Sequence, residues 1–164
     1  MIILGLDPGL RFTGWGLVNH EGQKTQYLAC GTITTKKEAG KNLADRLVLI
    51  HDELQSLFES HSPDEAAVEE TFSNVNAKTT LMLGQARAIS LLVPKLNGVD
   101  VSEYSANQVK KTVCGSGHAG KEQMMRMVKM LLPKAQFKND HEADALAIAL
   151  CHAHQRGHHK MLAG

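Results

Sequence analysis

Several residue types are scarce in this chain, and each scarcity excludes a class of protein. Only three cysteines occur among 164 residues, Cys30, Cys114 and Cys151, and their spacing is not that of a metal-binding cluster. We therefore expect reduced thiols in a cytoplasmic protein rather than a disulfide scaffold. No apolar run approaches the ~20 residues of a membrane-spanning helix, and no secretory signal is recognisable.

Net charge is also small, +1 over the whole chain, but the charges are unevenly distributed. Between residues 38 and 70 there are nine acidic residues and two basic ones, whereas between 105 and 138 there are seven basic residues and one acidic. A basic third in a near-neutral chain suits a polyanion bound on one side of the molecule. The alternative is a solvated helix face, which is what most charge runs are.

Hydrophobic periodicity predicts a sheet of mixed direction covered by helices. Strand patterns over 2–7, 12–19 and 25–34 predict an antiparallel meander of three strands. Helical patterns at 41–60, 76–96, 106–113, 121–132 and 141–154 follow, and short strand patterns at 66–68 and 98–104 lie among them. This order predicts an α/β fold in which two parallel strands extend the meander and helices flank both faces. We place one domain at 1–154 and a disordered polar tail at 155–164.

Two carboxylates stand at the ends of predicted strands. Asp7 ends the first apolar run, before Pro8 and Gly9, and Glu69 ends the strand that follows the first long helix. The carboxyl ends of adjacent parallel strands meet at one crevice, so the two carboxylates would face one another if their strands are neighbours. Such a pair favours a bound cation, and oxygen ligands suit Mg²⁺ or Mn²⁺. Taken alone, Asp7 is explained equally well as a cap of the Pro-Gly turn.

The last predicted helix adds His141 and Asp144. They are three residues apart and so share one face of its first turn. Capping and the helix dipole explain Asp140 and Glu142 well, but not Asp144, which lies on the face that should be buried. Acidic and imidazole groups from three separate segments suggest a two-metal site for phosphodiester hydrolysis, and the imidazole favours Mn²⁺. The alternative for His141 is a core histidine bonded to a backbone carbonyl.

Several motifs together resemble the RuvC family of Holliday junction resolvases. They follow the family's order and spacing over residues 1–154, and they lie at 4–9, 13–16, 67–72, 83–87, 108–113 and 143–148. The resemblance implies a ribonuclease H-like fold and a homodimer that nicks two opposed strands of a four-way DNA junction with a divalent metal. It places Asp7, Glu69 and Asp144 on the family's catalytic carboxylates. His141 falls where many members have a further aspartate, which puts the metal preference in question.

The same resemblance implies contacts with DNA and with partners. Phe72 matches an aromatic residue that the family places against junction bases, and Lys110 and Lys121 match basic residues near the scissile phosphate. The alternatives are a core position for Phe72 and solvated side chains for the two lysines. The 76–96 region helps to form the family's dimer, and its apolar residues exceed what one helix face needs. Branch-migration motor proteins and a nucleoid-associated location are further expectations.

Three rival classes share part of this pattern. An actin-like or sugar-kinase ATPase opens with a similar strand and Asp-Gly turn, but it needs a second domain that 164 residues cannot supply. Another ribonuclease H-like nuclease, of the YqgF type acting on RNA, does not explain the 83–87 motif or the basic segment. A non-catalytic junction-binding module is disfavoured because all three carboxylates are present. The sequence thus predicts a junction endonuclease with two Mg²⁺ or Mn²⁺ ions per subunit, held by Asp7, Glu69, His141 and Asp144.

Overall fold

A single five-stranded sheet organises the chain. The computed structural model describes residues 1–35, 42–70 and 76–162, with side chains through 156. In chain order the elements are β1 (Ile2–Asp7), β2 (Phe12–Glu21), β3 (Lys24–Thr34), α1 (Leu43–His61), β4 (Glu65–Glu69), α2 (Ala77–Leu96), β5 (Asp100–Tyr104), α3 (Ala106–Cys114), α4 (Lys121–Leu131) and α5 (Asp140–Leu162). The strand order is β3-β2-β1-β4-β5. The first three strands pair antiparallel and β4 and β5 join them in parallel, which confirms the predicted mixed sheet.

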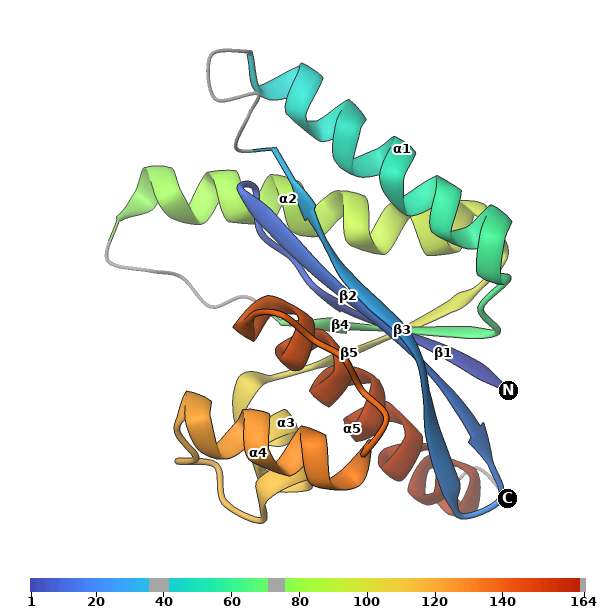
Figure 1. Cartoon of the computed structure of the whole chain (residues 1–164). Helices are drawn as coiled ribbons and strands as arrows, with labels where there is room; N and C mark the ends of the chain where they lie inside the picture. Colours follow the sequence, from blue (N-terminus) through green and yellow to red (C-terminus); the bar gives the residue numbers. More distant parts are fainter. Residues whose placement is uncertain (36–41, 71–75, 163–164) are drawn as a thin grey trace.

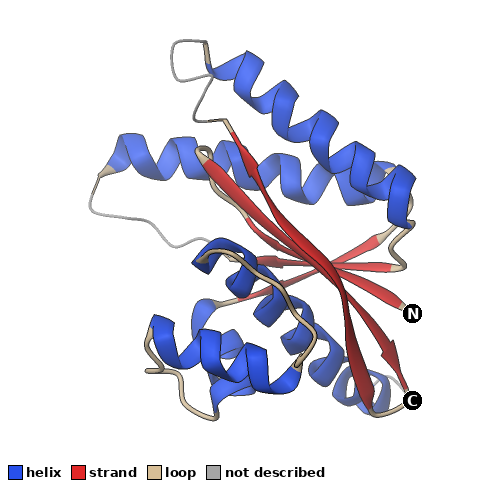
Figure 2. Ribbon diagram, in the orientation of Figure 1, coloured by secondary structure: helices blue, strands red, loops and turns tan. Residues whose placement is uncertain are grey.

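Helices cover both faces of this sheet, as predicted. Helices α1 and α2 lie on one face, and α3, α4 and α5 lie on the other (Figures 1 and 2). Alternation along β1 explains the two cores: Leu4 and Leu6 pack on the α1–α2 side, and Ile3 packs on the α5 side. By the same alternation Asp7 faces α5. The end of β1 is therefore directed to the side on which the predicted site lies.

Helix α5 approaches the sheet closely because glycines line its path. A Cβ added at Gly14 on β2 would lie 2.1 Å from the carbonyl oxygen of His141, and one at Gly5 on β1 would lie 2.1 Å from that of Ala145. Any side chain at these positions would displace the helix. The two glycines thereby let the first turn of α5 lie directly over the end of β1.

The last helix is longer than predicted. It runs to Leu162, whereas the periodicity predicted an end at His154. Arg156 donates from Nε and Nη2 to the Glu65 carboxylate at 2.6–2.8 Å, which anchors this polar segment to β4. Gln155 and Arg156, which we place in a disordered tail from the sequence, lie in α5 instead: Gln155 Nε2 donates to Thr112 Oγ1 at 3.3 Å, and Arg156 reaches Glu65, 91 residues earlier in the chain. No helix in the described part of the chain is long and apolar enough to cross a membrane.

Candidate active site

Two carboxylates lie side by side where β1 and β4 end. The parallel register pairs Leu6 with Val68, so the next residue on each strand, Asp7 and Glu69, are neighbours on the same face. Ala67, which shares that face with Glu69, belongs to the core beneath α5. The predicted meeting of the two strand ends is thus what the topology produces.

The first turn of α5 brings His141 and Asp144 to these strand ends. The His141 Nδ1–H donates to Asp7 Oδ2 at 3.0 Å, since a carboxylate can only accept. This hydrogen bond raises the pKa of His141, although partial burial opposes the rise. The imidazole also stacks on Phe12, with 5.4 Å between the ring centroids. His141 is therefore bound to a carboxylate rather than to a backbone carbonyl.

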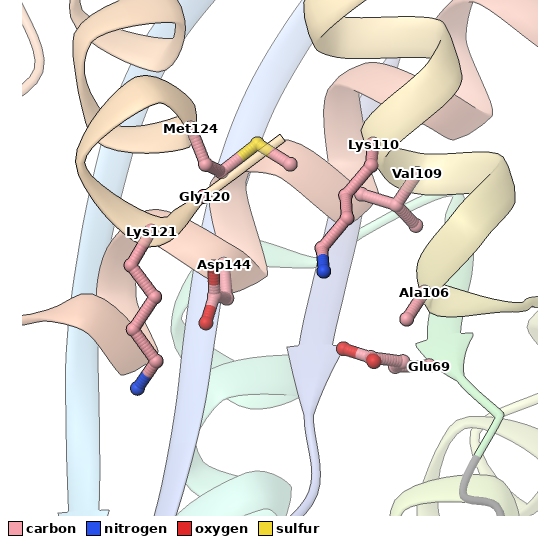
Figure 3. Close-up of a pocket in the computed structure, with 8 residues that line it drawn as sticks. All are labelled: Glu69, Ala106, Val109, Lys110, Gly120, Lys121, Met124 and Asp144. Atoms are coloured by element: carbon pink, nitrogen blue, oxygen red, sulfur yellow. The ribbon is translucent and has the colours of Figure 1, made fainter. Parts of the chain in front are cut away.

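A pocket of about 180 Å³ opens beside this cluster. Its lining comes from β4, α3, α4 and α5 and consists of Glu69, Ala106, Val109, Lys110, Gly120, Lys121, Met124 and Asp144. In Figure 3 the Lys110 ammonium points into the space between Glu69 and Asp144, and Lys121 lies beyond Asp144 and points away. The Lys121 ammonium instead donates to Asp140 Oδ2 at 2.7 Å. The two predicted phosphate contacts thus differ: Lys110 faces the carboxylates, and Lys121 is paired at the rim.

Electrostatic repulsion marks the carboxylates as one cluster. Burial, followed by the charges of Asp7 and Asp144, raises the pKa of Glu69 to about 7, and Lys110 only partly offsets this. Burial, Asp7 and Asp140 raise the pKa of Asp144 to about 6 against the opposing effect of Lys121 and His141. Carboxyl groups that disfavour one another's charge in this way are typical of functional sites. We call Asp7, Glu69 and Asp144 the carboxylate cluster.

The donor chemistry of this cluster fits a divalent cation. Within the described residues, no three histidine, cysteine, aspartate or glutamate side chains form a group that could hold a metal ion as they are placed. One oxygen of Asp7 is engaged by His141, so ligation by both residues requires their side chains to turn. The carboxylates nevertheless offer hard oxygen ligands, and a cation between them would offset the burial and the repulsion that raise the pKa values of Glu69 and Asp144.

The remaining site predictions have different outcomes. Phe72, predicted to contact junction bases, lies outside the described residues. Glu142, which we attributed to the helix dipole, is only 5% exposed and reaches β3 instead of solvent. The sequence gives little indication that Glu142 is buried, because its burial depends on the packing of α5 against a strand more than 100 residues away.

Comparisons with known proteins give matches over nearly the whole chain. The sequence profile described as "Crossover junction endodeoxyribonuclease RuvC" matches residues 3–152. A protein of that name from Rhizobium etli is 54% identical over 159 residues, which cover 97% of this chain and 93% of the relative. The solved Thermus thermophilus RuvC structure superposes with a TM-score of 0.86 at 32% identity and covers 97% of both chains. The T. thermophilus RuvC in complex with Holliday junction substrate gives a TM-score of 0.86 at 33% identity, over 93% of both chains.

Proposed function

The chain belongs to the RuvC family of crossover junction endodeoxyribonucleases, and from this premise we propose how its residues cut DNA. It is a nuclease that resolves Holliday junctions, and it binds four-way junction DNA. Its cleavage depends on a divalent metal. The observation that carries the residue assignment is the convergence of Asp7, Glu69 and Asp144, where burial and then mutual repulsion raise the pKa values of Glu69 and Asp144.

We assign the metal to the carboxylate cluster, assisted by His141. The charge of Asp7 raises the pKa of both Glu69 and Asp144, so Asp7 interacts with each of the other two carboxylates. A residue in this position would suit a ligand that two ions share. Glu69 and Asp144 would complete the ligation, with Mg²⁺ or Mn²⁺ as the ion and two ions per subunit. When bound, such ions activate water and stabilise the leaving oxygen of a phosphodiester.

Two further side chains act on charge and protons near the cluster. Lys110 points into the pocket between Glu69 and Asp144, where its ammonium can neutralise a phosphate oxygen (Figure 3). His141 holds a proton on Nδ1 toward Asp7 and lowers the repulsion within the cluster. When His141 turns from Asp7, its imidazole can ligate an ion or orient water.

The DNA and protein contacts extend from this centre. Lys121, paired with Asp140, would exchange that carboxylate for a backbone phosphate, and Phe72 would stack on a junction base. A homodimer with two-fold symmetry would set two centres on two opposed strands. Support for the dimer comes from α2, on which Leu81, Leu92 and Leu96 are 69%, 48% and 67% exposed. Branch-migration motor proteins are proposed partners, and the cytoplasm, at the nucleoid of a bacterial cell, is the proposed place of action.

A substrate panel tests the activity. Synthetic four-way junctions, linear duplex and RNA–DNA hybrid are each incubated with Mg²⁺ or Mn²⁺, and nicks are mapped on denaturing gels. We expect paired nicks on opposed strands of the junction and little cleavage of the other substrates. Equal cleavage of linear duplex or hybrid would contradict junction selectivity, and junction binding without cleavage would indicate a binding module.

A second experiment tests the metal preference. His141→Asp places a carboxylate where the imidazole stands, and harder oxygen ligands favour Mg²⁺ over Mn²⁺. The ratio of the Mn²⁺ rate to the Mg²⁺ rate should therefore fall relative to that of the parent protein. An unchanged ratio would show that His141 does not ligate the ion.

A further inference from the structure

The carboxyl group of Glu142 is buried beside the active centre and is bound entirely by donors. Its Oε2 accepts from the Lys138 backbone N–H at 2.7 Å, and its Oε1 accepts from Asn139 Nδ2 and Thr32 Oγ1, each at 3.2 Å. The Cys30 thiol donates to Oε2 at 3.8 Å. Glu142 is only 5% exposed, and among the described residues no cation forms a salt bridge with it. A buried carboxyl with this many donors fixes the elements that supply them.

These donors come from two parts of the fold, the segment just before α5 and the strand β3. Lys138 and Asn139 precede α5, and Asn139 Oδ1 accepts from the Glu142 backbone N–H at 3.0 Å, which caps the helix. Thr32 lies on β3, at the edge of the sheet, and hydrogen bonds to both Asn139 and Glu142. The first turn of α5 is therefore tied to the edge strand at its cap.

Besides the contacts that Glu142 and Asn139 make with β3, the His141–Asp7 hydrogen bond is the other polar contact that the described residues show between this turn and the sheet. Gly14 allows the backbone of His141 to come close to β2, but a gap without a side chain permits contact and does not enforce it. The hydrogen bonds to Glu142 hold the turn in this position. They act on both working residues because Glu142 follows His141 directly and lies half a turn before Asp144.

We propose that Glu142 is a positioning residue of this nuclease, which holds the first turn of α5 so that His141 and Asp144 meet Asp7. It touches neither substrate nor metal and acts through its neighbours. The inference rests on the proposed function, since it takes His141 and Asp144 to be working residues. It goes beyond that function by assigning their placement to a buried carboxyl and its partner Thr32 on β3.

The test compares Glu142→Ala with a control variant at Glu65 of β4, the carboxylate that binds the other end of α5. Glu65→Gln weakens the anchor of Arg156 and His152 on β4 and leaves the first turn of the helix intact. Junction cleavage is measured at a temperature where both variants are folded by circular dichroism, with kcat, KM and the Mg²⁺ concentration for half-maximal rate determined separately. In parallel, ¹⁵N NMR of the histidine side chains reports the His141 Nδ1–H in protein without metal or DNA.

Glu142→Ala should lower kcat on the order of 10- to 100-fold, because small misplacements of reacting groups have effects of that size. It should also raise the Mg²⁺ midpoint and shift the His141 Nδ1 resonance, while KM for the junction stays within about 2-fold because the basic surface is unchanged. Glu65→Gln should change none of these quantities. If Glu142→Ala does not fold, Thr32→Val removes one donor at nearly constant volume and should produce the same changes at smaller size.

Three outcomes distinguish the failure of this inference from the failure of the proposed function. If Asp7→Asn abolishes cleavage but the folded Glu142 or Thr32 variant keeps the parent kcat, Mg²⁺ midpoint and His141 resonance, Glu142 has no positioning role. If Asp7→Asn still cleaves at the parent rate, the carboxylate cluster itself is not the catalytic centre. If Glu65→Gln changes kcat and the midpoint as much as Glu142→Ala does, the effect is one of general stability and the inference is overturned.

Discussion

Two glutamates at the ends of one short strand have opposite electrostatic surroundings. Glu65 begins β4 and Glu69 ends it, and both face the same side of the sheet. At Glu65, burial tends to raise the pKa, but hydrogen bonds from Arg156 and His152 outweigh it and the pKa is lowered. At Glu69, burial and the carboxylates of Asp7 and Asp144 raise the pKa to about 7.

The difference separates an anchor from a working group. Glu65 receives two N–H donors of Arg156 and the Nε2–H of His152, whose Nδ1 in turn lies 2.8 Å from the Tyr104 hydroxyl. Its charge is satisfied within the protein and stabilises the fold. Glu69 has only the partial compensation of Lys110, so its charge destabilises the protein and favours an added cation. The same residue type on the same strand therefore performs two tasks because of what surrounds it.

The largest expected effect is that of removing the Glu69 carboxylate, the working group of the two. Glu69→Gln should lower junction cleavage by roughly 10³-fold, since a lost metal ligand removes several kcal/mol of transition-state stabilisation. The same change should raise the melting temperature of the protein without metal, because it removes a charge that its neighbours repel. Gel-based cleavage rates and thermal melts in chelator measure the two effects. A variant that loses both activity and stability would contradict the assignment.

Glu65→Gln removes the charge of the anchor and should show the reverse pattern, with lower stability and nearly unchanged cleavage. Loss of the charge-assisted hydrogen bonds from Arg156 and His152 should destabilise the protein by about 1–3 kcal/mol. Junction cleavage by the folded variant should remain within about 2-fold of the parent rate, as expected for a residue away from the reacting groups. Urea denaturation and kcat provide the two readings. A large loss of kcat in fully folded protein would refute the division into anchor and working group.

The pH dependence of stability should sharpen the comparison. In the folded protein the pKa values of Glu69 and Asp144 are raised to about 7 and about 6. Between about pH 4.5 and 7 the folded protein therefore binds more protons than the unfolded chain does. Its free energy of unfolding in chelator should fall as the pH rises through this range. The raised pKa of His141 acts in the same direction. Glu65, whose pKa is lowered, contributes stability at neutral pH that is lost only below about 4.5. Melts across this range should show the fall, and Glu69→Gln should flatten it. A parent curve that is flat or rising between pH 5 and 7 would contradict the shifts.

The smallest expected effect concerns the rim of the pocket. Asp140→Asn removes the partner of Lys121, an exposed pair whose contribution to stability should be within about 1 kcal/mol. A freed Lys121 should bind phosphate more readily, so junction affinity should rise slightly and depend more steeply on salt. Fluorescence anisotropy at several salt concentrations measures this change, with Lys111→Ala as a control on the exposed face of α3. Unchanged affinity and salt slope in Asp140→Asn would exclude a phosphate contact by Lys121.

The sequence predicted the strand ends well because two local rules combine there. Alternation along each strand and the parallel pairing of β1 with β4 together place Asp7 beside Glu69, and both rules are visible in the pattern. Helical spacing likewise placed Asp144 near His141. The partners of these groups could not be predicted, because they depend on packing between distant segments. The Lys121–Asp140 pair, the burial of Glu142 against Thr32 and the anchoring of Arg156 on Glu65 all join elements that no local period relates.

The central claim is that Asp7, Glu69 and Asp144 hold the divalent metal, and proton release on metal binding tests it most directly. Mn²⁺ is titrated into the protein by calorimetry at pH 6.5 and at pH 8.5, in two buffers with different ionisation enthalpies. At pH 6.5 the raised pKa of Glu69 leaves it largely protonated, so Mn²⁺ binding should release protons, whereas at pH 8.5 release should be close to zero. Glu69→Gln should reduce the release at pH 6.5 to the smaller part that Asp144 and His141 contribute. Mn²⁺ binding with no proton release at pH 6.5, or with the same release in Glu69→Gln, would contradict the account.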